Sequence, residues 1–158
     1  MDTLEAATLL ARAGVEVTLE LIGEGYESLL AGHEELPRSL TITTTGLLSR
    51  EDAHQRVCNA DVYVTSTLYE EWGYAVVEAL MLGTPVVAYP VYPFSELLKN
   101  GLGVVAAAPT PSSLAQAIQR AASKQGLAEN LAETAALRFD AGSIGGRLTE
   151  IWTTALTS

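Results

Sequence analysis

The sequence contains few cations and a single cysteine. Nine lysines and arginines stand against 19 aspartates and glutamates, which gives a formal net charge of −10. Nucleic-acid binding depends on clustered cations that neutralise phosphates, so this charge balance argues against a nucleic-acid partner. Cys58 has no second cysteine with which to form an internal disulfide. Its place in a helix-like stretch favours a buried structural thiol without chemistry of its own.

Long apolar runs and metal-ligand clusters are also missing. Hydrophobic residues make up 48% of the chain, but polar segments interrupt them before they reach the run of about 18 that a membrane span requires. The acidic start of the chain lacks the positive segment of a signal peptide. We therefore expect a cytoplasmic protein without a membrane span. His33 and His54 lack ligand spacing to Cys58 and to each other, so we expect no metal site and no bound cofactor.

The 158 residues match the size of one domain, and their hydrophobic pattern changes repeatedly between two periods. Alternating or β-branched stretches predict strands at residues 15–22, 40–45, 61–65, 84–89 and 103–107. Helical spacing and capping residues predict helices at 3–13, 26–30, 49–60, 71–82, 93–100, 110–124, 127–138 and 144–156. Strands that alternate with helices predict an α/β fold with a Rossmann-like, doubly wound parallel sheet. Helices cover both faces of such a sheet, and ligands bind outside the carboxyl ends of its strands.

The predicted order has one irregularity, because it begins with a helix. A doubly wound sheet normally starts with the strand at its centre. We therefore expect residues 1–158 to form a single domain that lacks its first strand and has an apolar seam in its place. Self-association, a partner chain or pairing of the two flanking strands would close this seam.

Two glutamates eight positions apart form the most informative pattern. Glu70 follows a predicted strand and lies beside the start of a helix, and Glu78 lies about two turns along that helix. Carboxylates accept hydrogen bonds from paired hydroxyls, so these two can reach different hydroxyls of one extended ligand. Gly73 has no Cβ, which lets backbone amides near the helix N-terminus approach a phosphate.

A solvated acidic helix start is the alternative interpretation of this pattern. Glu70 and Glu71 would then favour the helix dipole, and Glu78 would merely be exposed. The neighbours of Glu78 make this harder to accept, because Val77 and Ala79 flank it on a helix that the sequence would bury. A buried carboxylate without a partner is costly, and local physics leaves the two interpretations about equal.

The residues around these glutamates also resemble a known family, the retaining GT-B glycosyltransferases, especially glycosyltransferase family 4 (glycosyl transferases group 1). The resemblance rests on the E-x7-E motif formed by Glu70 and Glu78 and on the stretch EALMLGTPVVA at residues 78–88. It extends over almost the whole chain. Residues 19–25 (LELIGEG) are similar to the family's strand and glycine turn, and residues 59–64 (NADVYV) to its A-D-v-x-v strand. The resemblance implies the C-terminal, donor-binding half of the GT-B fold.

The resemblance also implies roles for individual residues. Glu70 would hold hydroxyls of the donor sugar at the catalytic centre, and Glu78 would hold the ribose hydroxyls of the nucleotide. The other donor-binding positions act through the backbone: Gly73, Tyr74 and Ala75 would meet the sugar and phosphates, Leu47 and Leu48 would line the base, and Gly23 and Gly25 would border the diphosphate.

Three departures from the family pattern bear on activity. Residues 91–96 are bulky where the family has small glycines, and residues 65–67 read Thr-Ser-Thr where it often has proline and serine. The family's preceding strand, with the arginine and lysine that neutralise the diphosphate, would lie just before Met1, and its N-terminal acceptor domain earlier still. Electrostatic support of the leaving diphosphate dominates such transfer, so we expect the isolated chain to be inactive.

The leading hypothesis is therefore a domain that binds a nucleotide-diphosphate sugar in a retaining glycosyltransferase, which transfers a hexosyl group to an acceptor. The alternatives are a non-catalytic sugar-nucleotide-binding or structural remnant or subunit, and a nucleotide-dependent epimerase of the same fold. An NAD-binding domain is disfavoured, because no G-x-G-x-x-G motif follows a predicted strand. The sequence leaves the nucleotide, the sugar and the acceptor open.

Overall fold

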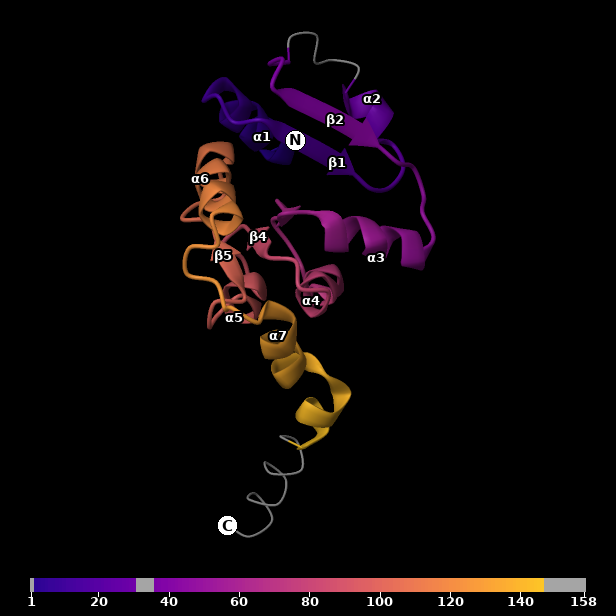
Figure 1. The fold of residues 1–158 in the computed structure, drawn as a ribbon, viewed down its shortest axis with the longest axis vertical. Coiled ribbons are helices and arrows are strands. Elements are labelled where there is room, and N and C mark those ends of the chain that lie inside the picture. The colour runs from indigo at the N-terminus through magenta and orange to yellow at the C-terminus, as the bar shows by residue number, and fades with distance from the viewer. Residues whose placement is uncertain (1, 31–35, 147–158) are drawn as a thin grey trace.

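The computed structural model describes residues 2–30 and 36–146, and within them helices alternate with strands (Figure 1). The strands are β1 (Val17–Leu21), β2 (Leu40–Thr44), β3 (Tyr63–Thr65), β4 (Val86–Ala88) and β5 (Gly103–Val105). The helices are α1 (Asp2–Arg12), α2 (Tyr26–Leu30), α3 (Arg50–Asn59), α4 (Tyr74–Met81), α5 (Phe94–Leu97), α6 (Pro111–Ala122) and α7 (Leu131–Phe139). Each corresponds to an element predicted from the sequence. Residues 141–146 are helical, and most of the helix predicted at 144–156 lies outside the described residues.

The strands form two separate parallel sheets. β1 pairs with β2 in a register that runs from Val17 opposite Leu40 to Leu21 opposite Thr44. The other sheet has the order β3-β4-β5, and both of its pairs are parallel. The predicted α/β arrangement with parallel strands is confirmed. Among the described residues no strand joins β1 to β3, so the suggestion that the strands flanking the seam pair with each other is wrong.

β4 lies at the centre of the buried core. Val86, Val87 and Ala88 are all 0% exposed. Val87 packs on one face in a cluster with Leu114 of α6, while Val86 and Ala88 belong to a second cluster with residues of α4 and α7. β4 therefore has a strand at each edge and helices on both faces, which is the environment that its continuous apolar sequence predicts.

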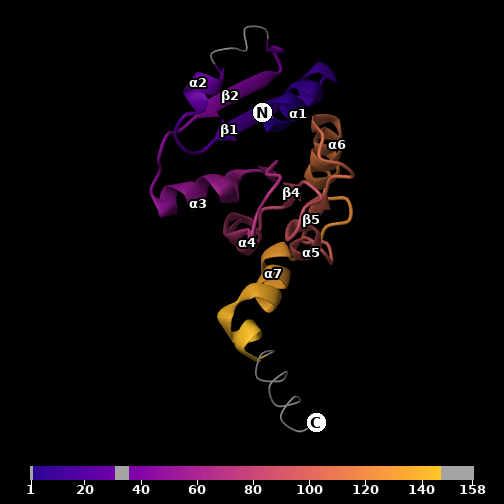
Figure 2. The same cartoon turned by 180° about the vertical axis from the view of Figure 1, so that it is seen from behind.

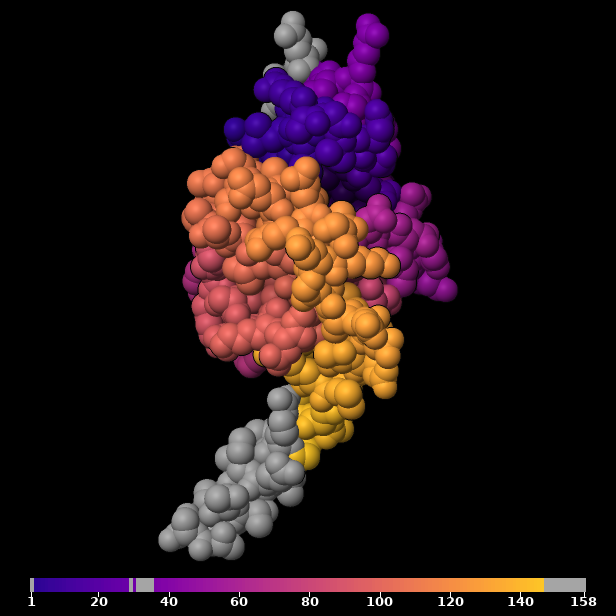
Figure 3. All heavy atoms as spheres, turned by 60° about the vertical axis from the view of Figure 1, so that its left-hand side comes forward, coloured from indigo at the N-terminus to yellow at the C-terminus, as the bar shows by residue number. Residues whose placement is uncertain are grey.

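Helix α1 connects the two sheets. Its residues Leu4, Ala7 and Ala11 pack with Leu40 of β2, whereas Ala6 and Leu10 belong to the cluster that contains Val87 of β4. In both cartoon views α1 lies beside α6 (Figures 1 and 2), and in the space-filling view the surface of α6 lies directly against the N-terminal part of the chain (Figure 3).

Caps and a close contact fix the local geometry. Ser49 caps α3 by accepting a hydrogen bond from the amide of Asp52 at 3.1 Å. Thr110 caps α6, and Pro111 occupies the first turn, where its missing N–H costs nothing. At Gly103 in β5, a Cβ would lie 2.5 Å from the carbonyl oxygen of Val86, so only glycine allows β5 to approach β4 this closely.

None of the helices in the described part of the chain combines the length and apolar character needed to cross a membrane.

Candidate functional site

The turns that follow β1 and β2 meet at the carboxyl ends of these strands. The amide of Gly23 donates a hydrogen bond to the carbonyl oxygen of Gly46 at 3.0 Å, and the two residues form an isolated bridge. Gly23 has φ 129°, Gly25 has φ 86° and Gly46 has φ 65°, a region that L side chains rarely adopt. Leu47 and Leu48 follow this bridge directly. The structure therefore brings together the glycine turn at residues 23–25 and the turn at residues 46–48 that is predicted to line the base.

Glu70 lies in the loop between β3 and α4, and its carboxylate is held by the backbone of that loop. Its Oε1 accepts hydrogen bonds from the amides of Trp72 at 3.2 Å and Glu71 at 3.0 Å. Hydrogen bonds from the amides of Gly73, Trp72 and Glu71 lower the pKa of Glu70 below its ordinary value, so it stays ionised at neutral pH. These amides already have an acceptor. The amides of Tyr74 and Ala75 follow them and begin α4. These two amides have no hydrogen-bond acceptor within the helix.

Gly73 is required by packing as well as by backbone conformation. It precedes α4 with φ 72°. A Cβ there would lie 3.0 Å from Cε1 of Phe94 and 3.2 Å from Cδ1 of Leu97, both on α5. Phe94 is one of the bulky residues at positions 91–96, where the family has small glycines. It is 1% exposed, so it fills the core beneath the loop. The sequence interpretation gave Gly73 a ligand-binding reason only.

Glu78 is not buried as its apolar neighbours suggested. Its side chain is 43% exposed, and its Oε1 accepts a hydrogen bond from Nη2 of Arg50 at 2.7 Å. Val76 and Ala79 face the buried side of α4, and Glu78 points away from it because successive residues are rotated by about 100° around a helix. The expectation that this helix buries Glu78 is therefore wrong, and the argument from burial against an exposed Glu78 does not hold. Sequence reasoning missed Arg50, although its position directly after the capping Ser49 fixes it at the start of α3.

Tyr63, the first residue of β3, lies near both glutamates. Burial is the main cause that raises the pKa of this phenol, and the charges of Tyr26, Glu78 and Glu70 raise it further. The phenol thus stays protonated and can donate a hydrogen bond. Tyr26 begins the helix that follows the glycine turn. Sequence reasoning missed this residue, because tyrosine is common in strands and no local pattern marks Tyr63.

Several other residues around the site are exposed. Leu47 and Tyr74 are each 75% exposed, Ala75 is exposed, and Leu48 is half-buried. Exposed aromatic side chains also follow β3 and β4: Tyr69, Trp72 and Tyr92, at 77%, 69% and 74%. The residues predicted to contact a donor are therefore open to solvent, apart from the buried Gly73.

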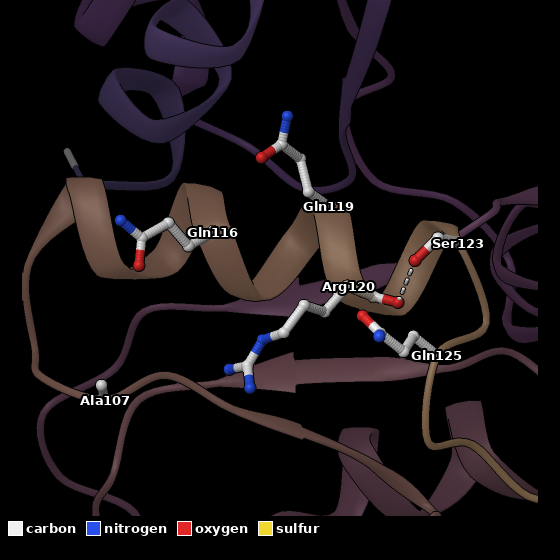
Figure 4. Close-up of a pocket in the computed structure, with 6 residues that line it drawn as sticks. All are labelled: Ala107, Gln116, Gln119, Arg120, Ser123 and Gln125. Atoms are coloured by element: carbon white, nitrogen blue, oxygen red, sulfur yellow. Dashed lines mark hydrogen bonds between the residues drawn. The ribbon is translucent and has the colours of Figure 1, made fainter.

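The described surface has shallow hollows on α6 and on α3, and the hollow on α3 includes Arg50, the partner of Glu78. The first, of about 490 Å³, lies along α6 and contains none of the predicted site residues (Figure 4). Its lining residues are Ala107, Gln116, Gln119, Arg120, Ser123 and Gln125. The second, of about 550 Å³, runs along α3 and includes Arg50 and His54. Because Arg50 binds Glu78, we take this hollow to be the one that adjoins the candidate site.

The prediction that Cys58 is a buried thiol is wrong. Cys58 is exposed, because α3 buries none of its residues fully. Its sulfur lies 3.9 Å from the carbonyl oxygen of Leu82. His54 Nε2 is buried without a hydrogen-bond partner, 3.8 Å from Glu78 Oε2. His33 lies outside the described residues.

Comparison with known proteins places this geometry in a family. The profile of the family "Glycosyl transferases group 1" matches residues 2–138. Alpha-D-kanosaminyltransferase of Streptomyces kanamyceticus is 26% identical over 159 residues, which cover 94% of this chain and 40% of that protein.

Two solved structures show the same fold. Sucrose-phosphate synthase from Thermosynechococcus elongatus superposes with a TM-score of 0.70 at 22% identity, over 99% of this chain and 42% of that one. HepE of Anabaena, solved in complex with UDP and glucose, gives a TM-score of 0.67 at 23% identity, over 96% of this chain and 44% of that one. This chain therefore spans less than half the length of these relatives.

Proposed function

This chain belongs to the glycosyl transferases group 1 family, and from that premise we propose that it is the donor-binding domain of a retaining glycosyltransferase. It would bind a nucleotide-diphosphate sugar for hexosyl transfer to an acceptor, in the cytoplasm. The observation that carries the proposal is the position of Glu70, whose carboxylate the loop amides hold between β3 and α4, together with the bridged glycine turns that follow β1 and β2, all at the carboxyl ends of parallel strands. Ligands of open α/β sheets bind at this edge.

The nucleotide end of the donor is assigned to Glu78. Arg50 occupies Oε1 of this carboxylate, and His54 Nε2 lies 3.8 Å from Oε2 without a hydrogen bond, so Oε2 would accept hydrogen bonds from the two ribose hydroxyls. The ion pair also holds the carboxylate in one orientation, so less conformational entropy is lost when the ribose binds. Leu47 and Leu48 lie just before Arg50 in the chain and are assigned to the base.

The sugar and diphosphate are assigned to the other end of the site. The loop amides occupy Oε1 of Glu70, and its Oε2 would accept a hydroxyl of the donor sugar. The amides of Tyr74 and Ala75 lie in the first turn of α4, where a helix stabilises an anion. Gly23 and Gly25 would border the same diphosphate through their backbone.

Transfer itself needs more positive charge than the described residues bring to this site. A leaving diphosphate has to be stabilised electrostatically, and Arg50 is already paired with Glu78. We propose that the donor binds without a metal or other cofactor, and that cations and acceptor contacts come from a further segment or partner chain.

A non-catalytic sugar-nucleotide-binding subunit or a structural remnant is the second candidate. The same shortage of cations favours this candidate.

Calorimetric titration with UDP-, GDP- and ADP-sugars tests the proposal. We expect binding by one nucleotide class at millimolar ligand, and loss of that binding in Glu78→Ala. Glu71→Ala is the matched control, because Glu71 is an exposed acid of the same segment outside the proposed contacts. Absence of binding by every donor, or equal binding by the Glu78→Ala variant, would contradict a donor site here.

A further inference from the structure

His54 has a buried nitrogen atom that forms no hydrogen bond with the described residues. This atom, Nε2, is shielded from solvent, although 31% of the side chain is exposed. A buried polar atom without a partner costs free energy, so it requires an explanation. The charged atom that faces it is Oε2 of Glu78, at a distance of 3.8 Å. This distance is about 0.9 Å longer than an ordinary N–H···O hydrogen bond.

The packing of α3 fixes His54 beside this carboxylate. His54 follows Arg50 by four residues, so both side chains leave α3 on the same face. The end of α3 is attached to the segment after α4, because Thr84 Oγ1 donates a hydrogen bond to the carbonyl oxygen of Val57 at 2.7 Å. The helix therefore directs two nitrogen atoms at one carboxylate. Arg50 Nη2 lies 2.7 Å from Oε1, and His54 Nε2 lies 3.8 Å from Oε2.

The two nitrogen-bearing side chains respond differently to pH. Arginine is always charged in proteins, whereas an imidazole changes its charge between about pH 5 and 8. Carboxyl, phenol, thiol and guanidinium groups ordinarily titrate outside this range. These are the groups of the other titratable side chains around His54, namely Glu78 on α4, Tyr63 on β3, and Arg50, Glu51 and Cys58 on α3.

The proton on Nε2 decides whether the histidine binds the carboxylate. In a neutral ring whose proton is on Nδ1, Nε2 is a hydrogen-bond acceptor. Two acceptors do not form a hydrogen bond, which agrees with the separation of 3.8 Å between Nε2 and Oε2. A protonated ring donates from both nitrogens, and its charge attracts the carboxylate. The hollow of about 550 Å³ that His54 lines gives the ring room to move toward Oε2.

We propose that His54 makes donor binding depend on pH by competing with the ribose for Oε2 of Glu78. At about pH 8 the neutral ring leaves Oε2 to the ribose hydroxyls, while Arg50 holds Oε1. Toward pH 5 the protonated ring donates a hydrogen bond to Oε2 and occupies the acceptor that the ribose needs. The donor must then displace a charge-assisted hydrogen bond, so its affinity falls. This inference rests on the proposed function, because it concerns the same donor site.

A direct attraction between the protonated ring and the diphosphate would have the opposite effect. In the proposed arrangement the diphosphate lies at Tyr74, Ala75 and the glycine turn, at the other end of the site from Glu78. The carboxylate of Glu78 also neutralises the charge of the protonated ring, so little attraction remains for a distant phosphate. Acid should therefore weaken donor binding.

Calorimetry at about pH 8 and pH 5.5 gives the first test, with UDP-, GDP- and ADP-glucose as ligands. The diphosphate of these donors stays fully ionised over this range, so the ligand itself does not titrate. The wild-type chain should bind the donor about threefold more weakly at pH 5.5, the size expected of a partly exposed ion pair. His54→Ala should give nearly the same affinity ratio as one, without this dependence on pH.

His33→Ala is the matched control, because His33 is the other histidine of the sequence. It should keep the pH dependence of the wild-type chain. Wild-type binding that is equal at both pH values or stronger in acid would overturn the inference. The same pH dependence in wild type and in His54→Ala would overturn it as well.

Carbon NMR of the Glu78 carboxyl group gives a second test that needs no donor. Its signal should move between pH 8 and 5.5 in the wild-type chain and stay nearly constant in His54→Ala. The carboxyl signal of Glu96, which is paired with Lys99, is the internal reference and should be the same in both chains. Identical Glu78 titrations in both chains would overturn the inference.

The two tests together separate this inference from the proposed function. Absence of binding by every donor at both pH values would contradict the proposed function, and the competition with it. Donor binding that requires Glu78 but does not respond to His54 would overturn the competition alone.

Discussion

Two parallel strands of this molecule differ sharply in burial. All three residues of β4 are 0% exposed, whereas β1 buries only Leu21 among its five residues. β4 has a strand at each edge and helices on both faces, while β1 pairs with β2 alone among the described strands. The difference teaches that burial of a parallel strand depends on neighbours at both edges. The half of the molecule around β4 is a complete core, and the half around β1 is not.

The candidate donor site is divided between these two halves. Glu70 and Glu78 belong to the three-stranded half, and the glycine turns after β1 and β2 belong to the other. Helix α3 connects them, because Arg50 binds Glu78 on α4 at 2.7 Å and Arg56 binds Glu20 on β1 at 2.9 Å. A donor that contacts both halves would therefore depend on their relative position.

The largest effect should come from a change that separates β5 from β4. Gly103→Ala places a Cβ 2.5 Å from the Val86 carbonyl oxygen and 2.9 Å from Cδ2 of Leu98. Relief of this overlap requires backbone movement, and we expect a loss of about 3 kcal/mol in the free energy of unfolding, measured by urea titration. The control is Gly146→Ala, where a Cβ meets nothing within 4 Å and helix propensity favours alanine. A loss equal to that of the control would contradict the packing described for β4.

A matched pair of valines compares the halves directly. Val87→Ala removes two methyl groups from a fully buried site and should cost about 2 to 3 kcal/mol, through lost burial and the cavity that remains. Val17→Ala removes the same groups from a half-buried site in β1 and should cost less than about 1 kcal/mol. Equal losses in urea unfolding would show that the two strands are equally well packed.

The hydrogen bond from Tyr89 to Asp2 joins the end of β4 to α1. Tyr89→Phe should cost about 1 kcal/mol near neutral pH. Burial, followed by the interaction with Asp2, raises the pKa of Tyr89, so the folded chain keeps a proton that the unfolded chain loses above about pH 10. The stabilising contribution is therefore present below about pH 10 and is lost as the pH rises further.

Thermal unfolding between pH 8 and 11 checks this titration. The wild-type chain should lose stability more steeply than Tyr89→Phe above about pH 10. Tyr92→Phe is the control, because its hydroxyl is on a side chain that is 74% exposed. Identical alkaline slopes for wild type and Tyr89→Phe would contradict a tyrosine that is buried and protonated at this position.

The smallest effects on stability should come from the arginines of α3. Arg50→Gln and Arg56→Gln each remove an exposed ion pair and should change the free energy of unfolding by less than about 0.5 kcal/mol. Their effects on donor binding should differ, because only Arg50 holds Glu78. Calorimetry should show several-fold weaker donor binding for Arg50→Gln and little change for Arg56→Gln. Equal donor affinities of the two variants would show that Arg50 does not contribute to the donor site.

Periodicity predicted the elements because each has a strong local signal. The alternating pattern of residues 17–21 and the continuous apolar run of residues 86–88 even anticipate the difference in burial between β1 and β4. The helix at the start of the element order followed from this periodicity. The division into two sheets did not, because which edges pair is decided by tertiary contacts of α1.

The site was only partly predictable for the same reason. The spacing of Glu70 and Glu78 marked them as candidates, which stays a prediction, and the orientation of Glu78 depends on the packing of α4 through Val76 and Ala79. Tyr63 and Arg50 are distant from the glutamates in sequence, and no local pattern marks them. The burial of Cys58 was predicted wrongly. The helical pattern of α3 was correct, but this helix buries none of its residues fully.

The most direct test of the donor site is a proton–nitrogen NMR titration of the isolated chain with UDP-, GDP- and ADP-glucose. Binding at the proposed place should shift the amides of residues 71–75 and of residues 46–48 together, at the same ligand concentration. The amides of residues 116–125, around the hollow on α6, should stay unchanged. Shifts confined to residues 116–125, or none at millimolar concentrations of every donor, would contradict a donor site shared by the two halves.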